Sequence, residues 1–367
     1  MKLVIGPFRI AASTSVVSRV CILALALLGG VSSIAPAQGS GALDQEVVKL
    51  RQAGEFDRAV SVALHDVAVA EHKVGPDHPS LAKTLNSLAA LYRVQGEFTK
   101  AEQLDKRSLA ICERAVGPDH PDVATSLNHL AGLYRTQGEF AKAEPLHKRA
   151  LEIYEKALGP DHLYVAKSLN KLADLYSRQG GFAKAEQLSK RSIAICEKAL
   201  GPDHPEVAMS LRNLAGIYRT QGDYEKAEPL YKRALQIVEN ALGLDHIVVA
   251  TSLHDLADLY RSQGDYTKAE LLDKRSLAIR ETVLGPDHPE VAKSLNNLAW
   301  IYSSIGDYAK AEPLQKRALE IYETALGPMH PTVATILYQL AALYRATQRA
   351  NEARSLERRA ATIRSMK

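Results

Sequence analysis

The sequence predicts an all-α protein in which helical hairpins stack into a solenoid. A Gly-Pro-Asp-His-Pro pentad first occurs at residues 75–79 and returns every 42 residues up to residue 327, with one or two substitutions in three of the copies. A fixed period of this length indicates stacked supersecondary units rather than separate domains. Between the pentads, apolar residues recur at helical spacing over a length that holds two helices. The chain of 367 residues is 46% hydrophobic and 24% charged, which supplies a large core and excludes disorder over most of its length.

Residues 1–37 have the order of a secretory signal peptide. Three cations, Lys2, Arg9 and Arg19, precede an apolar stretch at 20–28, and an Ala-Pro-Ala site ends at Ala37. This stretch is shorter than the roughly 20 residues that span a bilayer, so we expect no stable membrane anchor after cleavage. The pattern predicts a periplasmic or secreted protein, and an organelle transit peptide is the minority alternative. Residues 38–42 are expected to form a short flexible linker.

The repeat array is expected to occupy residues 43–366. It begins with a shortened repeat at 43–74 and ends with a capping repeat at 327–366, whose arginines form a basic, solvated end. Six regular repeats lie between them, at 75–116, 117–158, 159–200, 201–242, 243–284 and 285–326. Each repeat is predicted to be a pair of amphipathic helices.

Glycine, proline and histidine mark the helix ends within each repeat. Gly96 is suited to the left-handed turn that ends a first helix, and Gly75 to the end of the preceding second helix. Pro76 forbids continuation, and Asp77 or His78 can cap the next helix. Prolines at 145, 229 and 313 fall past the first turn of their helices. We expect a bend there and no break, because the apolar spacing continues.

These residues resemble a known repeat family. The positions that match the tetratricopeptide pattern are Leu85, Leu88, Ala89, Tyr92, Gly96, Phe98 and Ala101. The 42-residue unit with its Gly-Pro-Asp-His-Pro loop resembles the kinesin-light-chain type. The resemblance implies a right-handed superhelix in which the first helix of each pair lines the concave side. It also implies that the outward polar positions of these helices meet an extended peptide or a partner helix.

Two columns of polar residues follow from that arrangement. The first contains Asn86, Asn128, Asn170, Arg212, His254, Asn296 and Tyr338. The second contains Arg93, Arg135, Ser177, Arg219, Arg261, Ser303 and Arg345. Asn both donates and accepts and can bind peptide backbone, whereas the Arg fork matches carboxylates. Trp300 departs from the small residues Ala90, Gly132, Gly216 and Ala342 at its slot. It would be an interface anchor if exposed, or a filler between helices if buried.

We therefore predict ten partner-binding residues and an extended or helical, acidic segment as their ligand. The ten are Asn86, Arg93, Asn128, Arg135, Asn170, Arg219, Arg261, Asn296, Trp300 and Arg345. Each Lys of the recurring Lys-Arg pairs follows a Glu by four residues, so that surface is expected to neutralise itself. The Arg column has no regular acidic partner one turn away, and both Arg135 and Arg219 are expected at the solvent. The alternative is that both columns are polar residues on an unused face.

The histidines and cysteines of the repeats predict structural roles. Equivalent loop histidines lie in repeats about 10 Å apart, whereas all ligands of one zinc lie about 2 Å from it, so we expect loop and cap roles and no metal. Cys112 and Cys196 are two repeats apart and cannot form an intramolecular disulfide. Tyr154, Val238, Arg280 and Tyr322 fill the same slot elsewhere. This variety suggests a slot that borders the core without being deeply sealed.

Composition and motifs exclude several function classes. Without the three leader cations, 43 basic and 42 acidic residues are left, a balance that gives no support to nucleic-acid binding. A phosphate loop, a His-Glu-x-x-His motif and a nucleophile elbow are all missing, so we predict no cofactor and no catalytic residue. The sequence therefore predicts a non-catalytic scaffold or adaptor that binds a protein segment. Two alternatives are an accessory subunit of a cell-envelope enzyme or secretion complex and an enzyme with an unfamiliar site.

Overall fold

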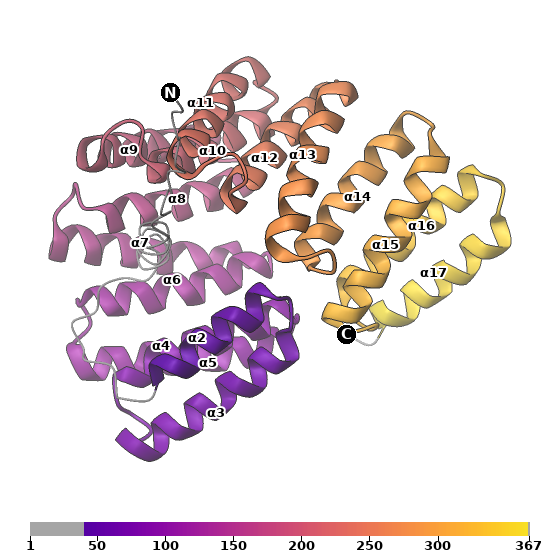
Figure 1. Ribbon diagram of the computed structural model, residues 1–367. Helices are drawn as coiled ribbons and strands as arrows, with labels where there is room; N and C mark the ends of the chain where they lie inside the picture. Colours follow the sequence, from indigo (N-terminus) through magenta and orange to yellow (C-terminus); the bar gives the residue numbers. More distant parts are fainter. Residues whose placement is uncertain (1–39, 366–367) are drawn as a thin grey trace, which may run out of the picture. The chain divides into compact units, whose positions relative to one another are not determined.

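The computed structural model describes residues 40–365 as an all-α array of helical hairpins (Figure 1). The expected signal peptide at 1–37 lies outside the described residues, as does the beginning of the expected linker. Within the described part, sixteen helices follow one another, labelled α2 to α17, and no strand occurs. The predicted all-α solenoid is confirmed. None of these sixteen helices combines the length and the apolarity that a membrane crossing needs.

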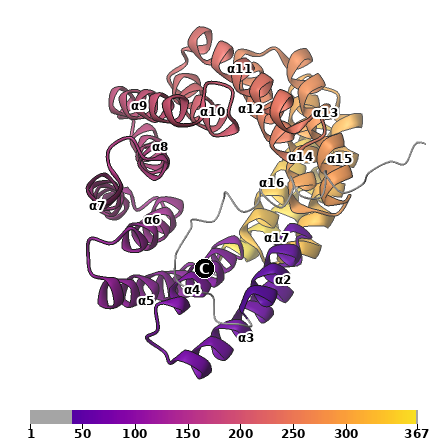
Figure 2. The same cartoon turned by 60° about the vertical axis from the view of Figure 1, so that its left-hand side comes forward.

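The helices pack as eight pairs, each made of an A helix and a B helix. The A helices are α2 (Ser40–Gln52), α4 (Ser80–Val94), α6 (Pro121–Thr136), α8 (Leu163–Arg178), α10 (Pro205–Gln221), α12 (Ile247–Gln263), α14 (Pro289–Ser304) and α16 (Pro331–Ala346). The B helices are α3 (Phe56–Val74), α5 (Phe98–Val116), α7 (Phe140–Leu158), α9 (Phe182–Leu200), α11 (Tyr224–Leu242), α13 (Tyr266–Leu284), α15 (Tyr308–Leu326) and α17 (Ala350–Ser365). Helices that follow one another in sequence pack together from α2 to α17, and α10 also contacts α8 and α12. Figure 2 shows α6, α8, α10 and α12 on the inner side of the stack.

Histidines cap the A helices, as the sequence predicts. The Nδ1 atom of His120 accepts a hydrogen bond from the backbone N–H of Asp122, at 3.2 Å. The same cap recurs at the five later loop histidines, from His162 to His330. Each cap satisfies one N–H that the first helical turn leaves without a partner. The histidine ladder therefore has a structural role.

Glycine ends the B helices in a conformation that differs from the predicted left-handed turn. Gly75 has a φ of 88° with an extended ψ of 161°. That region of the backbone map is essentially restricted to glycine. The left-handed turn occurs instead after A helices, where Gly222 has a φ of 82° and a ψ of 6°. Both kinds of turn explain why glycine recurs at these positions.

The three prolines do not interrupt their helices. Pro145, Pro229 and Pro313 each lie inside a B helix of 19 residues, the same length as the regular B helices without proline. The prediction that these helices continue through proline is confirmed. The packed apolar face offsets the one hydrogen bond that each proline removes.

A recurring ion-pair and hydrogen-bond clamp joins consecutive repeats. The Glu102 carboxylate accepts from Lys106 of its own helix at 2.7 Å and from the Tyr134 hydroxyl of the next repeat at 2.8 Å. Both bonds lower the pKa of Glu102, the one from Lys106 more. The other repeats carry the same clamp at Glu144, Glu186, Glu228, Glu270 and Glu312. The predicted pairing of each Lys with the preceding Glu is confirmed.

The arginine of each Lys-Arg pair reaches back to the preceding repeat. Arg107 donates to Glu71 at 2.6 Å and to the carbonyl of Pro76 at 2.7 Å. Equivalent ion pairs join Arg149 to Glu113, Arg191 to Glu155, Arg233 to Glu197, Arg275 to Glu239, Arg317 to Glu281 and Arg359 to Glu323. An exposed pair contributes about 0–1 kcal/mol, so these contacts act through their repetition. The Lys-Arg pairs therefore serve repeat stacking.

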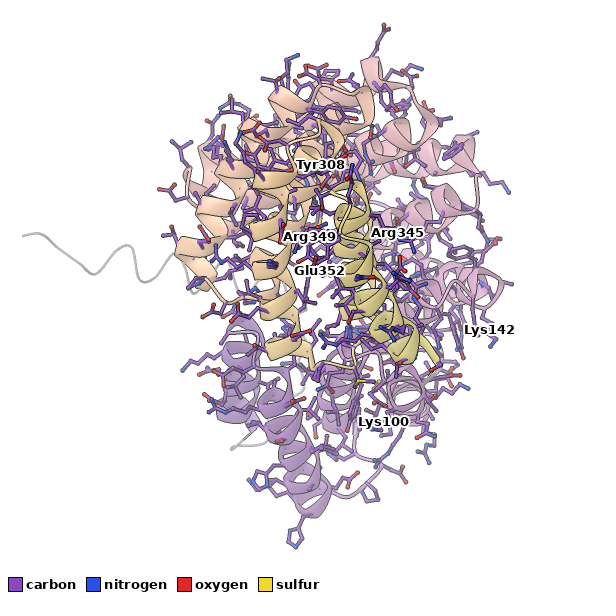
Figure 3. All side chains as sticks on the ribbon, turned by 90° about the vertical axis from the view of Figure 1, so that its right-hand side faces the viewer. Lys100, Lys142, Tyr308, Arg345, Arg349 and Glu352 are labelled. Atoms are coloured by element: carbon purple, nitrogen blue, oxygen red, sulfur yellow. The ribbon has the colours of Figure 1, made fainter. Side chains whose placement is uncertain are left out.

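The C-terminal repeat uses a different set of contacts. Gln348, where the other repeats have glycine, adopts a positive φ of 63°. The Arg349 guanidinium lies 3.8 Å from the centre of the Tyr344 ring and donates to Glu312 at 2.7 Å. It also forms two hydrogen bonds with Glu352, and Figure 3 shows Arg349 and Glu352 beside each other. Cation–π and ion-pair contacts thus tie α17 to the rest of the stack.

The slot that contains the cysteines is deeply buried, so the prediction of an incompletely sealed slot is wrong. Cys112 is 5% exposed, Cys196 3% and Arg280 only 1%. Both thiols are free, and burial raises their pKa. The Arg280 guanidinium donates to the Ser294 hydroxyl and lies 3.7 Å from the Glu290 carboxylate. Different residue types are tolerated at this position because each is buried against its own neighbouring side chains, as Arg280 is against Ser294 and Glu290.

The first two pairs of the array contact loops near its other end. Because His330 Nδ1 accepts from Thr332 N–H, its Nε2–H donates to the Val94 carbonyl of α4, at 3.2 Å. Gly54, in the α2–α3 turn, lies against the Pro289 ring at the start of α14. A Cβ atom placed on Gly54 would be 2.8 Å from Pro289 Cδ. Repeats that are distant in sequence therefore meet through backbone and ring contacts.

A pair of glycine substitutions tests this end-to-end contact. Gly54 and Gly138 have φ values of 75° and 77°, but a Cβ at Gly138 would have no neighbour within 4 Å. Both Gly54→Ala and Gly138→Ala are expected to lose about 1–2 kcal/mol from backbone strain. Only Gly54→Ala should also speed amide hydrogen exchange in the first turn of α14, because its new methyl displaces Pro289. Equal exchange at α14 in both variants would contradict the contact.

Candidate functional site

The asparagine column lies closer to the A–B helix seam than the sequence suggested. Asn86 and Asn128 are each only 7% exposed, so their expected outward position is wrong. Asn128 Oδ1 lies 2.7 Å from Nδ1 of His147 on α7. Asn170 is partly buried and donates from Nδ2 to the Ser210 hydroxyl at 2.9 Å. Asn128 thus faces the B helix of its own pair, whereas Asn170 faces the next A helix, α10.

Several arginines of the column have acidic partners, and Arg135 is only partly exposed, which corrects its expected place at the solvent. Arg135 forms an ion pair with Asp174 at 2.8 Å, and its side chain is 31% exposed. Arg345 contacts Glu357 at 2.7 Å. These acidic partners lie on the next A helix or on the following B helix, where sequence spacing within one helix does not show them. Figure 3 shows Arg345 on the surface of the C-terminal pair.

Arg93 differs from the other arginines of its column. Its NH1 donates to the carbonyl of His129 on α6, at 3.1 Å. The nearby Asp105 carboxylate is fully buried, and within the described residues neither oxygen has a hydrogen-bond partner. Burial raises the pKa of Asp105 to about 7, and the positive charge of Arg93 opposes this shift. Asp105 is thus a buried carboxyl that gains little from the cation beside it.

The equivalent pair four repeats later is fully bonded. Asp273 occupies the slot of Asp105 and accepts from Arg261 at 2.6 Å. His254 Nδ1 also lies 3.2 Å from the Asp273 carboxylate, and Arg261 forms a second ion pair with Asp258. Desolvation lowers the pKa of Arg261, and Asp273 opposes that shift. Both charges of this buried cation–carboxylate network are therefore compensated.

Sequence reasoning missed a more accessible column, one residue after the asparagine column. It contains Ser87, His129, Lys171, Asn213, Asp255, Asn297 and Gln339. All seven are partly or fully exposed, whereas Asn86 and Asn128 in the preceding column are buried. The hydrophobic period locates the buried face of an A helix only to within about one residue. The signal that distinguishes the two columns is the burial of neighbouring side chains, which a repeat pattern alone does not reveal.

A pocket on the A helices brings together four of the ten predicted residues. It has a volume of about 300 Å³ and is formed by side chains of α10, α12, α14 and α16. Its lining is Arg219, Asp258, Arg261, Ser262, Asn296, Asn297, Trp300 and Gln339. The predicted residues in this lining are Arg219, Arg261, Asn296 and Trp300. The other six, Asn86, Arg93, Asn128, Arg135, Asn170 and Arg345, do not line it.

Trp300 forms part of the pocket wall and is 44% exposed. Its ring meets the Tyr266 ring edge-on, with the ring centres 6.0 Å apart. Alanine or glycine occupies its slot in four other repeats, at Ala90, Gly132, Gly216 and Ala342, so the fold does not need a bulky side chain there. Of the two alternatives for this residue, its exposure favours the surface position over a buried filler.

Three polar atoms of the pocket residues are buried without a hydrogen-bond partner among the residues described. They are Arg219 Nε, Asn296 Oδ1 and Gln339 Oε1. Buried polar atoms are nearly always bonded, and an unmade bond costs about 1–3 kcal/mol. These three unmade bonds are therefore an energetic cost that the residues around the pocket carry.

The charges around the pocket balance. Arg261 is compensated by Asp258 and Asp273, as described above. Arg219 forms no ion pair within residues 40–365, and its side chain lies beside the Tyr231 hydroxyl. The two arginines and two aspartates sum to zero. In the same part of the chain, no group of three or more His, Cys, Asp or Glu side chains is arranged to hold a metal ion.

Comparison with family models identifies the repeat. The model described as "Tetratricopeptide repeat" matches residues 80–156, 122–198, 182–240, 206–282, 249–324 and 305–365. A search of curated proteins found no significant match. The tetratricopeptide resemblance predicted from the sequence is confirmed by the family model.

Solved structures with similar folds include other repeat proteins of this kind. A putative kinesin light chain from Podosopora anserina, with nearly identical TPR-like repeats, is 28% identical over 56% of this chain and 97% of its own, with a TM-score of 0.46. BtubC (BKLC) from P. vanneervenii is 27% identical over 65% and 93%, with a TM-score of 0.48. A signal transduction ATPase with a tetratricopeptide repeat sensor from Pyrococcus horikoshii is 22% identical over 87% and 47%, with a TM-score of 0.55.

The two equivalent aspartates predict opposite effects of removing a charge. The folded pKa of Asp105 is about 7 against an ordinary value of 3.8, so its contribution to stability is complete below pH 3.8 and is lost as the pH rises through 7. Asp105→Asn should therefore stabilise the protein by about 1–3 kcal/mol at pH 8 and have little effect near pH 4. Urea unfolding of variant and wild type at both pH values measures the difference.

The matched control for this experiment is Asp273→Asn. It removes the partner of Arg261 and His254, and breaking such a buried pair costs about 3–5 kcal/mol. We expect clear destabilisation at pH 8. A destabilised Asp105→Asn at pH 8 would show that Arg93 already pairs with Asp105 in solution.

Proposed function

Because the chain belongs to the tetratricopeptide repeat family, we propose that it is a non-catalytic scaffold that holds a segment of a partner protein on its A helices. The observation that supports this proposal most directly is the pocket shared by α10, α12, α14 and α16. A site built by four successive repeats suits an elongated ligand, because each repeat adds a neighbouring set of contacts. A segment of on the order of twenty extended residues, at about 3.3 Å each, would follow the whole array.

The side chains in and around the pocket suit a polypeptide. Trp300 offers an exposed aromatic surface, and such residues are frequent anchors at interfaces. Arg219, Asn296 and Asn297 line the pocket, and their side chains are of the kind that bind backbone or polar groups. This combination of one aromatic wall with a few polar groups is typical of recognition sites.

The N-terminal half of the A-helix face supports binding of an acidic part of the same segment. Burial, with the charges of Arg93 and Lys171, lowers the pKa of His129 to about 4. Burial, with the charges of Lys171 and Arg135, lowers the pKa of His147 to about 3. Both imidazole rings are neutral at pH 7. Their lowered pKa values reflect, besides burial, the positive charges of Arg93 on α4, Arg135 on α6 and Lys171 on α8. A carboxylate on the partner would reduce the repulsion among these three cations.

Selection from a random library of 12-residue peptides on the full-length protein tests the proposed function. We expect enriched peptides whose binding slows amide exchange on α10, α12 and α14. Their binding should show no dependence on metal ions or nucleotides. Failure to enrich any peptide, or protection confined to the B helices, would contradict the proposal.

Trp300→Ala should weaken the selected peptides by roughly tenfold or more, the loss typical of an aromatic anchor. Alanine is compatible with the fold because Ala90 and Ala342 occupy the same slot. The control is Leu271→Ala, which removes a side chain on α13 that is 71% exposed and outside the pocket. Calorimetric titration measures both affinities. Equal affinities for the two variants would exclude Trp300 from the binding surface.

A further inference from the structure

We propose that copies of this chain associate with one another, the turn rim of one copy docking on the loop rim of a second copy. The turn rim is formed by the turns that join the A and B helices of each pair, at residues 53–55 and every 42 residues after them. The loop rim is formed by the histidine loops that precede the A helices, at residues 75–78 and every 42 residues after them. This inference goes beyond the proposed function and does not depend on it.

Two turns of the turn rim already dock on the loop rim within one chain. A Cβ atom placed on Gly54 would lie 2.8 Å from Pro289 Cδ and 3.6 Å from His288 Cδ2. In the next repeat, the Val94 carbonyl accepts from His330 Nε2–H at 3.2 Å, beside the turn glycine Gly96. Gly54 and Gly96 are 42 residues apart, as are His288 and His330. The same docking therefore occurs twice in successive repeats, so it is a property of the repeat.

Hydrogen-bonding groups left over on both rims explain this docking. On the turn rim, the N–H groups of residues 95–97 donate to the carbonyls of residues 91–93 and bypass the carbonyl of Val94. The ends of helices leave such carbonyls without a donor. On the loop rim, Nδ1 of His330 accepts from the Thr332 N–H, which places the ring proton on Nε2. The docked pair thus joins the donor that a histidine cap creates to the acceptor that an A helix leaves.

The docked residues are buried, whereas their equivalents in other repeats are exposed. His288 is only 8% exposed, and Gly54 is buried as well. The equivalent loop residues His120 and His162 are exposed, and so is the turn residue Gly138. Burial lowers the pKa of His288, and a hydrogen bond with the backbone of Arg51 opposes this shift. Contact between the rims therefore excludes water from both surfaces.

Most of each rim is unoccupied in the single chain. In the α6–α7 turn, the N–H groups of residues 137–139 donate to the carbonyls of residues 133–135, which leaves the Thr136 carbonyl in the position of Val94. The turn glycines with no atom within 4 Å of an added Cβ are Gly138, Gly180, Gly222, Gly264 and Gly306. The capping histidines whose Nε2 has no hydrogen-bond partner within residues 40–365 are His78, His120, His162, His204 and His246. Both halves of the docking contact are thus available to a second copy.

Repetition makes such a contact strong enough for association. A single neutral hydrogen bond contributes about 0.5–1.5 kcal/mol. Consecutive repeats present the same groups at a regular spacing, so several can dock in register. The two rims are different surfaces, and a copy that docks through its turn rim keeps its loop rim accessible. We therefore expect open-ended association, in which further copies add, and not a closed dimer.

Sedimentation equilibrium of the full-length protein over a range of concentrations tests the inference. The weight-average mass should rise steadily with concentration and pass the mass of two chains. The first variant combines His120→Asn, His162→Asn and His204→Asn. Asparagine is a good helix N-cap and has no group at the position of Nε2, so the array should stay folded while association weakens about tenfold or more. The matched control is His65→Asn, which changes an exposed histidine of α3 outside both rims.

A second variant, Gly180→Asn with Gly222→Asn, obstructs the other rim. Asparagine tolerates the φ values of 78° and 82° at these positions, and an added Cβ has no neighbour there within the chain. Its side chain would collide with a docked loop, as a Cβ on Gly54 would with Pro289. We expect the helical circular dichroism to be retained and association to be weakened about tenfold or more.

Three results would overturn the inference. The first is a wild-type protein that stays monomeric up to millimolar concentration. The second is a mass that stops at two chains, which would show a closed interface. The third is association as strong as that of the wild type in either folded variant, which would place the contact away from the rims. None of these results bears on the binding of a partner segment to the A helices.

Discussion

No hairpin of this chain can bury its own apolar face, and contact between neighbouring repeats supplies the missing surface. Leu81 and Leu85 of α4, Ile111 of α5 and Val123 of α6 all belong to one cluster of buried side chains, and each is 0% exposed. That cluster continues from α2 to α13, while related clusters cover the rest of the array. Stacking is thus the condition on which both the stability of each repeat and the alignment of the A helices depend.

Specific polar contacts fix how the repeats stack. The clamp of Glu102, Lys106 and Tyr134 connects a B helix to the A helix of the following repeat, and its equivalents recur along the array. Arg107 and its equivalents connect each B helix to the one before it. Because these residues lie away from the pocket, the A-helix face is left free to vary between repeats. The departures Trp300, Gln339 and Asp258 occur there, in repeats whose clamps are unchanged.

Features set by residue spacing within one repeat could be predicted from the sequence. Features set by how the helices and repeats pack against one another could not. The 42-residue period, the histidine caps and the Lys-Glu pairs follow from spacing within one repeat, and the structure contains all three. The burial of Asn86 and Asn128 depends on a rotation of the A helix by about one residue, which the apolar pattern does not resolve. The partners of Arg135 and Arg345 lie on other helices, and the Val94–His330 contact spans most of the array. The pocket itself could not be predicted, because four repeats must be superposed in space before its lining is defined.

The central claim is that four A helices, α10, α12, α14 and α16, bind a segment of a partner protein. Crosslinking of the protein in its native cells, followed by mass spectrometry of the linked peptides, tests this claim most directly. The account predicts links from Lys293 of α14, the one lysine within α10, α12, α14 and α16, to a single stretch of a partner. Links concentrated on the B helices, with the A helices unmodified, would contradict it.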